Sequence, residues 1–321
     1  MQRRKFISKS LLGSGLMLSA PWKSYFNAGF APENMPYATL GRTGVSVSRL
    51  GIGCAPLQRS HVSVNDVGNV IHTALEMGVN YFDVAPNYGS AEEKMGPSVK
   101  DVRNKMFLVT KTEDPTYEGT WKLLEQSMKR LQTDYLDLVH IHNLGLESRF
   151  PNLKLAFSDK GCLGALKDAK EKGVVRFIGA SGHLFPSRFH QALDTGEIDV
   201  LMNAVNFIVQ HTYDFENKVW SRAREENIGL VAMKVLGGQK KGKGYRIPEE
   251  HYENAIRYAL NLKKVATAVI GIENLAELQQ ALQAVRKFSG ISAEEKFNID
   301  QAGLELAQED SWRDAYGKPE S

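Results

Sequence analysis

Four side chains suited to proton transfer lie at or just after the ends of short apolar stretches of the sequence. Such stretches are typical of buried strands. Asp83 ends the run YFD and Tyr88 follows five residues later, while Lys111 ends FLVTK and His142 ends DLVHIH. Taken singly, each has an ordinary structural explanation: a surface lysine, a tyrosine packed in a turn or a core histidine. Brought together at one end of a sheet, they could donate a proton to a carbonyl oxygen.

The four side chains differ in what each could contribute to that reaction. A phenol donates poorly at neutral pH because its ordinary pKa is about 10. A nearby ammonium group lowers that pKa, so we expect Lys111 to act on Tyr88. We expect Asp83 to hold Lys111 charged and in place, and His142 to orient the substrate oxygen. No side chain supplies a hydride, so reduction at such a site requires a nicotinamide cofactor.

The elements that would position these side chains are short apolar runs that alternate with helical patterns. This alternation predicts an α/β fold, a (β/α)8 TIM barrel, preceded by a β-hairpin at residues 37–49. A doubly wound sheet would alternate too, but no GxGxxG follows the first run. The predicted strands are residues 49–54, 81–84, 106–111, 136–142, 175–180, 200–206, 228–235 and 267–271. The predicted helices are residues 64–77, 119–131, 164–172, 186–193, 216–227, 248–262 and 275–285, and a further helix begins after Tyr88.

Composition is that of an ordinary globular chain. The 321 residues are 42% hydrophobic and 24% charged, enough for a large core. The two cysteines, Cys54 and Cys162, give no disulfide framework and no metal-ligand spacing, so we expect no metal. Residues 1–28 hold five basic residues and no acidic one; subtracting these from the formal +3 leaves −2, which gives no reason to expect a nucleic-acid partner.

The amino-terminal residues have the pattern of a twin-arginine export signal over residues 1–28. Arg3 and Arg4 precede Phe6 and Ile7, and an apolar run covers residues 11–20. The pattern predicts the twin-arginine machinery as a partner and a periplasmic or cell-envelope location, with cleavage between residues 21 and 31. The run is short for a stable membrane span. The alternative is a basic, disordered terminus on a cytoplasmic protein.

Four stretches of the chain resemble the aldo-keto reductase family. LGRTGVSVSRLGIGC is similar to the family's opening, and GVNYFDVAPNYGSAEEKMG resembles its FDTAxxYGxxExxxG signature. SMKRLQTDYLDLVHIH and GVVRFIGASG resemble two later motifs, and the likeness covers residues 36–285 in the expected order. It implies an (α/β)8 barrel at residues 36–310 with a tail at 311–321. It also implies NAD(P)H-dependent reduction of a carbonyl substrate, with Tyr88 as general acid in a tetrad with Asp83, Lys111 and His142.

The resemblance also implies where the cofactor and substrate lie, with departures from the family's pattern. Ser181-Gly182-His183 stands where the family has Ser-Asn, and Met233 stands where it has an aromatic residue. On the sixth strand either Met202 or Asn203 would contact the carboxamide group of the nicotinamide ring. The residues implied for cofactor binding are Ser181, Gly182, Asn203, Met233, Lys234, Leu236, Gly237, Gly271, Asn274, Glu277 and Gln280; those implied for the substrate are His183 and Cys54.

The choice between NADP and NAD depends on the turn after the last strand. Members that prefer NADP usually offer Lys or Arg there, whereas this chain offers Glu273 and Glu277. A carboxylate repels a 2′-phosphate and suits a free hydroxyl, so we expect dual or NAD-leaning use. The glycine- and lysine-rich residues 237–244 are either a loop that closes over the pyrophosphate or a solvated loop.

Two other functions fit parts of the pattern. His140, His142 and His183 could serve a metal-dependent barrel hydrolase. The departures from the family's pattern at the residues that contact the nicotinamide carboxamide would also suit a non-catalytic, cofactor-binding or regulatory barrel. We expect the long segment at residues 144–161 to help set substrate choice.

Overall fold

The computed structural model describes residues 35–238 and 245–312, and the expected export signal lies outside these ranges. Eight parallel strands form a closed barrel in the order β12-β3-β4-β5-β6-β7-β8-β9, which confirms the predicted (β/α)8 fold. The strands are β3 (Leu50–Gly53), β4 (Tyr81–Asp83), β5 (Phe107–Thr112), β6 (Leu136–His142), β7 (Val175–Gly182), β8 (Val200–Ala204), β9 (Gly229–Met233) and β12 (Val265–Gly271).

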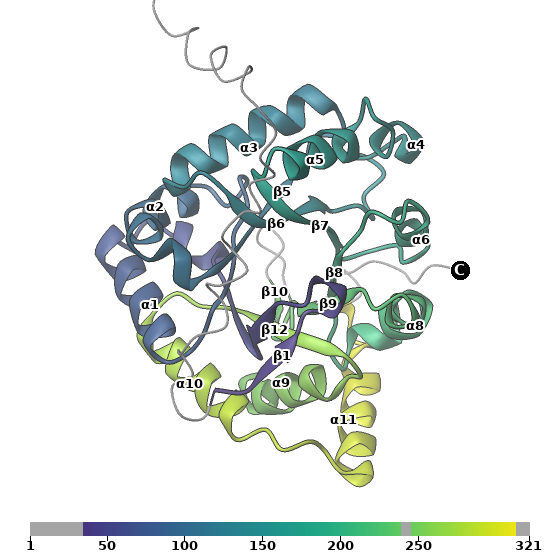
Figure 1. The fold of residues 1–321 in the computed structure, drawn as a ribbon. Coiled ribbons are helices and arrows are strands. Elements are labelled where there is room, and N and C mark those ends of the chain that lie inside the picture. The colour runs from purple at the N-terminus through teal and green to yellow at the C-terminus, as the bar shows by residue number, and fades with distance from the viewer. Residues whose placement is uncertain (1–34, 239–244, 313–321) are drawn as a thin grey trace, which may run out of the picture.

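Helices surround this barrel on its outer side (Figure 1). They are α1 (Val64–Glu76), α2 (Ala91–Val102), α3 (Tyr117–Leu131), α4 (Leu153–Ala156), α5 (Cys162–Glu171), α6 (Ser187–Asp194), α7 (Phe215–Lys218), α8 (Trp220–Glu225), α9 (Tyr252–Asn261), α10 (Leu275–Arg286) and α11 (Ala293–Leu306). Short 3-10 helices are η2 (Gly41–Thr43), η3 (Ala55–Gln58), η4 (Arg103–Lys105), η5 (Val209–His211) and η6 (Glu249–His251). Among the described residues no helix is long and apolar enough to span a membrane.

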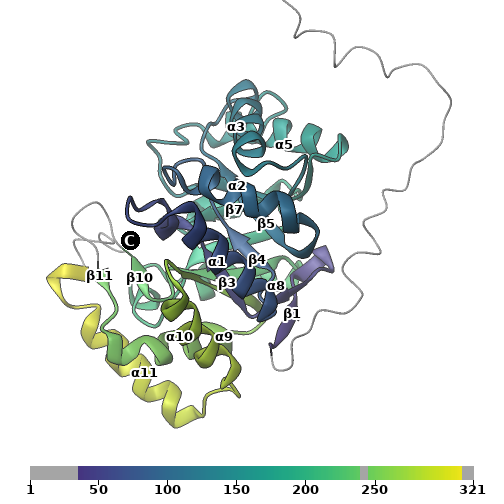
Figure 2. The ribbon, with the colours of Figure 1, turned by 90° about the vertical axis from the view of Figure 1, so that its left-hand side faces the viewer.

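Polar side chains at the helix starts explain where several of these helices begin. Ser63 forms a capping box with Asp66 at the start of α1, and Ser292 does the same at the start of α11. The side chain of Asn274 accepts from a backbone amide at the start of α10. Helix α11 was not predicted, and it lies beside α9 at the edge of the barrel (Figure 2).

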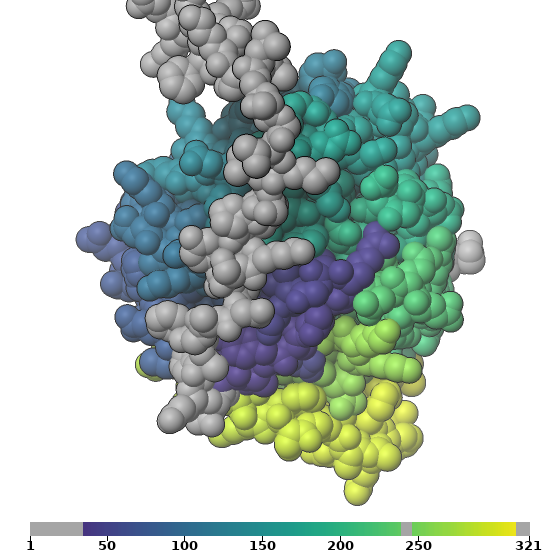
Figure 3. All heavy atoms as spheres, viewed as in Figure 1, coloured from purple at the N-terminus to yellow at the C-terminus, as the bar shows by residue number. Residues whose placement is uncertain are grey.

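The predicted hairpin is present and closes one end of the barrel. Strand β1 (Tyr37–Thr39) pairs antiparallel with β2 (Ser46–Ser48). Between them, Arg42 donates to the carbonyl oxygens of Gly196 and Ile198, which precede β8. The hairpin therefore covers the amino ends of the strands, and it crosses the face shown in Figure 3. A second antiparallel pair, β10 (Gly237–Gly238) with β11 (Tyr245–Arg246), flanks residues 239–244, which lie outside the described ranges.

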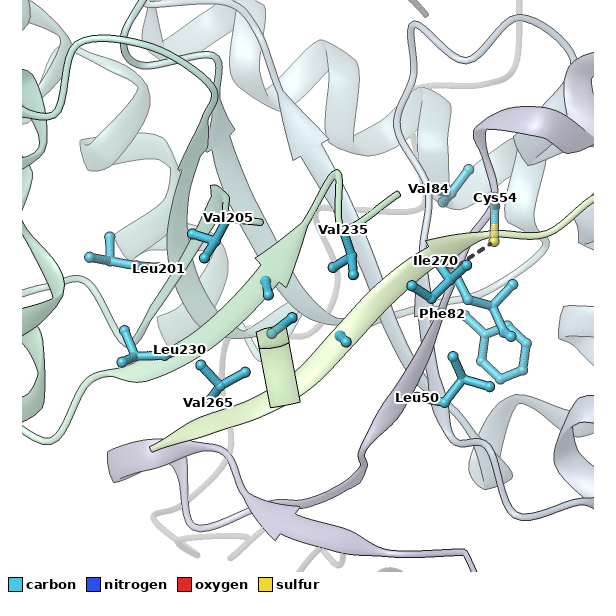
Figure 4. Packing of buried hydrophobic residues seen from close by; sticks show 14 of the residues in the cluster. Leu50, Cys54, Phe82, Val84, Leu201, Val205, Leu230, Val235, Val265 and Ile270 are labelled. Carbon is cyan, nitrogen blue, oxygen red and sulfur yellow. Dashed lines mark hydrogen bonds between the residues drawn. The ribbon is translucent and has the colours of Figure 1, made fainter. Parts of the chain in front are cut away.

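Strand residues alternate between the barrel interior and the layer under the helices. One hydrophobic cluster fills the interior and includes hairpin residues such as Val47. The other lies outside the strands and includes Phe82, Leu201 and Leu230 (Figure 4). Because the side-chain period of a strand is two, Asp83 faces the interior when Phe82 faces the helices. The alternation thus decides which strand-end residues can reach the open mouth of the barrel.

Candidate active site

Three neighbouring strands bring the predicted tetrad residues to the same end of the barrel. Asp83 ends β4, Lys111 lies one residue before the end of β5, and His142 ends β6. In the parallel register Lys111 is opposite His140, and His142 is opposite Ser181 of β7. The carboxyl ends of barrel strands are the usual place for a catalytic site in this fold.

Lys111 and Asp83 form a buried ion pair. Nζ of Lys111 donates to both carboxylate oxygens of Asp83, at 2.7 and 2.8 Å, and to the carbonyl oxygen of Val84 at 2.8 Å. Burial alone would lower the pKa of Lys111, but the charge of Asp83 and the Tyr88 phenol more than offset it, so the pKa is raised. The ammonium group is therefore charged and fixed in position, as expected from the sequence.

Tyr88 lies in the loop after β4, with its ring next to the ammonium group of Lys111. The distance from Nζ to the ring centroid is 4.9 Å. Burial raises the pKa of the Tyr88 phenol, and Lys111 lowers it by a smaller amount. The net pKa is therefore above its ordinary value in the protein alone. The expectation of a lowered pKa was right about the effect of Lys111 and wrong about the balance, because burial has the larger effect.

His142 is neutral and is held from one side. Its Nδ1 is 3.0 Å from Oγ of Ser181. Burial, and then the charge of Lys111, hold the pKa of His142 well below its ordinary value. His183 is a close neighbour, with ring centroids 6.3 Å apart, and burial lowers its pKa to about 3. Both rings can therefore serve as neutral hydrogen-bonding groups at the mouth.

The structure does not bring Asn203 to this site. The oxygen of its side chain accepts from Nε1 of Trp220 at 2.9 Å, and its nitrogen is 3.4 Å from the carbonyl oxygen of Gly182. Asn203 is fully buried and, like Leu201 two residues before it, faces outward from the barrel, whereas Met202 belongs to the interior cluster. Its hydrogen bonds hold helix α8 against the barrel, so its place differs from that expected of a carboxamide ligand.

Cys54 lies next to the tetrad but has no exposed surface. Its thiol is 3.7 Å from the carbonyl oxygen of Ile52, and it packs in the outer cluster near Val84 and Ile270 (Figure 4). Burial raises the pKa of the thiol far above its ordinary range, with Asp83 adding to the effect. Cys54 therefore packs as a small apolar residue and does not line a surface that a substrate could reach.

The residues at the end of β9 and after it differ in their surroundings. Lys234 has a left-handed backbone, with φ of 56°. Burial, and then the charge of Lys111, lower the pKa of Lys234. Met233 belongs to the interior cluster. Gly237 lies in the short β10 strand, opposite Arg246.

A cavity of about 330 Å³ lies beyond the end of β12. It brings together four residues expected to bind the cofactor: Leu236, Gly271, Glu277 and Gln280. Asn274 does not line the cavity; its side chain caps α10 by accepting from the backbone amide of Glu277.

Two residues that sequence reasoning missed, Asn87 and Glu113, form a cluster at the mouth with Arg149, which lies in the long segment expected to help set substrate choice. Glu113, from the loop after β5, is 3.6 Å from Nε2 of His142. Asn87 donates to Glu113 at 2.6 Å, and Arg149 pairs with the other carboxylate oxygen. We call Asn87, Glu113 and Arg149 the Glu113 cluster. Its one signal in the sequence is that Glu113 lies two residues after a predicted strand that ends in the candidate catalytic residue Lys111.

The arrangement of the histidines differs from that of a metal centre. His142 bonds to Ser181, and His140 is fully buried beside Gly179 inside the barrel. Within residues 35–238 and 245–312, no three His, Cys, Asp or Glu side chains are grouped to hold a metal ion.

The fold and the mouth residues are those of a barrel oxidoreductase that acts on carbonyl groups. Residues 49–254 match the aldo/keto reductase family, and the chain belongs to that family. It is 25% identical to L-galactose dehydrogenase of Arabidopsis thaliana over 315 residues, covering 85% of this chain and 95% of that protein. It is also 25% identical to D-arabinose 1-dehydrogenase of Saccharomyces cerevisiae over 285 residues, covering 74% of this chain and 82% of that one.

Solved structures show the same fold. An aldo-keto reductase from Bacillus halodurans superposes with a TM-score of 0.68 at 23% identity, over 83% of this chain and 96% of that chain. An aldo/keto reductase from Klebsiella pneumoniae, solved with NADP and acetate, has a TM-score of 0.66 at 16% identity, over 83% and 94%.

Proposed function

We propose that this protein is an NAD(P)H-dependent reductase of aldehydes or ketones, able to run in reverse on the alcohol, in which Tyr88 donates the proton. The observation that carries the proposal is the buried Lys111–Asp83 pair with the phenol of Tyr88 above it, beside a neutral His142. These groups can bind and protonate an oxygen on which negative charge develops.

The side chains divide the work at the substrate oxygen. His142 donates a hydrogen bond that orients the oxygen, and Ser181 fixes the ring. Tyr88 gives up its proton, and Lys111 stabilises the phenolate that forms. Asp83 holds Lys111 in place through two hydrogen bonds. Because the pKa of Tyr88 lies above its ordinary value, the phenol is protonated throughout the neutral range.

A nicotinamide cofactor supplies the hydride when bound, and the chain offers a place for its adenosine end. Gly271, whose backbone a ligand can approach closely, and Gln280 both line the cavity beyond β12. Ser181 in β7 and Lys234 after β9 would hold the rest of the cofactor, together with Leu236 on the cavity wall.

The charges of this cavity support NAD at least as well as NADP. Two cations line it, Arg246 and Lys287, against the four carboxylates of Glu249, Glu250, Glu253 and Glu277. A surplus of carboxylates disfavours a 2′-phosphate and suits ribose hydroxyls. We therefore expect NADH to bind within about tenfold of NADPH, a difference of about 1.4 kcal/mol. Fluorescence titration of both cofactors measures this; a hundredfold preference for NADPH would reject it.

Removing the proton donor tests the chemistry itself. Tyr88→Phe keeps the ring beside Lys111 and deletes the hydroxyl. We expect turnover of a reactive aldehyde to fall by at least about a hundredfold, the usual scale for losing a general acid. Cofactor affinity should stay within about threefold, since the hydroxyl is not needed for binding. Unchanged turnover would remove Tyr88 from the mechanism.

A non-catalytic, cofactor-binding or regulatory role is the second candidate. A relative described as a probable voltage-gated potassium channel subunit beta of Oryza sativa is 33% identical over 122 residues, 34% of this chain and 37% of that one. Asn203, bonded to Trp220, does not face the mouth. This role gains support if the protein binds NADH or NADPH but reduces no aldehyde, ketone or quinone in a broad panel.

The proposed location is the periplasm or cell envelope, with export as a folded protein. The twin-arginine pattern at Arg3 and Arg4 supports it. Amino-terminal sequencing of protein from the periplasmic fraction should begin between residues 21 and 31. Recovery of intact Met1 from the cytosol would contradict export.

A further inference from the structure

The carboxylate of Glu113 joins three loops at the mouth of the barrel. Asn87 comes from the loop after β4, Glu113 from the loop after β5, and Arg149 from the loop after β6. Asn87 donates to Oε1 at 2.6 Å, and Arg149 pairs with Oε2. The side chain of Glu113 is 15% exposed, against 4% for His142 beneath it, so the carboxylate lies between the buried tetrad and solvent.

Ser181 and Glu113 together favour a proton on Nε2 of His142. The ring is neutral, so it has one N–H, and Oε1 of Glu113 is 3.6 Å from Nε2. An ionised carboxylate only accepts, and it favours a proton on the nitrogen that faces it. The Ser181 hydroxyl, which can donate, is 3.0 Å from Nδ1 and completes this arrangement. We assign the Nε2–H form, whose proton points to the mouth.

The contact between Glu113 and His142 leaves that proton available. At 3.6 Å, Oε1 and Nε2 are too far apart for a hydrogen bond between them. An oxygen placed between Nε2 and Tyr88 can accept the proton, as the proposed reduction requires. A second substrate group beside that oxygen would then face Oε1, which has a lone pair free after accepting from Asn87.

We propose that Glu113 binds a hydroxyl group on the carbon next to the reacting carbonyl, so that the substrates are α-hydroxy aldehydes or ketones, the chemistry of open-chain sugars. The proposal rests on the proposed reductase function. Two oxygens on adjacent carbons have a separation suited to Nε2 and Oε1, the one accepting and the other donating. A substrate carboxylate would be repelled by Glu113, and a plain alkyl chain would leave its lone pair without a donor.

Three aldehydes of equal carbon number test this assignment. Lactaldehyde has the hydroxyl on the adjacent carbon, 3-hydroxypropanal has it one carbon further, and propanal has none. We expect kcat/KM of the wild type to favour lactaldehyde over both others by at least about tenfold, since the other two leave a polar group unpaired. Equal values for lactaldehyde and propanal would overturn the assignment.

Substitution of Glu113 shows whether it is the group responsible. In Glu113→Leu we expect kcat/KM for lactaldehyde to fall by about 10- to 100-fold and that for propanal by less than about threefold. Glu113→Gln, which keeps the shape and an acceptor oxygen, should recover part of the preference. Equal losses on both substrates would mean that Glu113 acts only by holding His142, and would refute a contact with substrate.

Matched controls separate this inference from the proposed function. Glu118→Gln changes an exposed glutamate at the start of α3 and should leave the ratio of the two kcat/KM values unchanged. Tyr88→Phe should lower turnover of both aldehydes alike. Wild-type protein that reduces propanal and lactaldehyde equally well refutes the inference alone. Protein that reduces no aldehyde with NADH or NADPH refutes the proposed function and the inference with it.

Discussion

Replacing the buried pair of Lys111 and Asp83 as a whole should affect catalysis more than stability. The exposed fractions of the two side chains are 0% and 4%. In Lys111→Met, Asp83 loses both hydrogen bonds and is left as an uncompensated buried carboxylate. We expect the free energy of unfolding to fall by about 3–5 kcal/mol, the usual effect of breaking a buried ion pair from one side. Asp83→Leu should cost a similar amount, because it leaves the ammonium group unpaired.

The double variant carries the test. Lys111→Met with Asp83→Leu replaces the pair by apolar side chains of similar volume, and such replacements are often neutral. We expect it to lose much less than the sum of the two single losses, a coupling energy of at least about 2 kcal/mol. It should nevertheless have at most about a hundredth of wild-type turnover, because the Tyr88 phenol is then buried without a cation.

Urea denaturation followed by circular dichroism measures the three free energies. The matched control is Glu226→Gln, which breaks an exposed pair with Arg222 and should change stability by less than about 1 kcal/mol. Additive losses in the double variant would refute the reasoning, since they would mean that the two charges do not compensate each other. A double variant with wild-type turnover would refute the proposed role of Lys111 in catalysis.

Two further variants test groups near the site. His140 is fully buried, and burial followed by the charge of Lys111 holds its pKa well below its ordinary value, so its ring must lose a proton to fold below about pH 6.5. The free energy of unfolding therefore falls as pH falls. His140→Gln should flatten this slope by about 1.4 kcal/mol per pH unit between pH 6.5 and 5. Denaturation at several pH values measures the slope, and an unchanged slope would contradict the prediction. Asn203→Ala leaves Nε1 of Trp220 unpaired and should lower stability by about 1–3 kcal/mol while the Kd for NADH changes less than threefold; a large loss of cofactor affinity with full stability would instead place Asn203 at the carboxamide.

The order of strands and helices was predictable because each strand is an apolar run buried on both faces. Where the predicted strands ran too long, a local hydrogen bond or backbone conformation explains the difference. Strand β8 stops at Ala204, before the predicted end at residue 206, because Oδ1 of Asn206 accepts from the amides of Ile208 and Val209 in the next turn. Strand β9 stops at Met233 because Lys234 turns left-handed.

Helix α11 could not be predicted from apolar periodicity, because little of it is buried. Ile299 and Gly303 are its buried residues, and Phe297 is exposed. The capping box of Ser292 with Glu295 was the usable signal, and it marks a helix start without marking its length. Trp312, at the end of the described residues, is fully buried.

Some site residues could be predicted from the ends of the apolar runs, whereas others depend on the register of the strands. Asp83, Lys111 and His142 were found because each lies at the end of an apolar run, and parallel strands bring such ends together. Asn203 is also near a strand end, but a shift of one residue along a strand exchanges the two faces. Whether residue 202 or 203 faces the interior depends on the strand's start and register, which Trp220 and the neighbouring strands determine.

The Glu113 cluster required the fold itself. Asn87, Glu113 and Arg149 are spread over more than sixty positions in irregular loops, where no period relates them. Their meeting point is set by the three adjacent strands that the loops follow. In the proposed function, the strand-end residues carry out the reaction and the loop residues set what is reduced. There the carboxylate of Glu113, 3.6 Å from Nε2 of His142, favours a hydroxylated substrate over an apolar one.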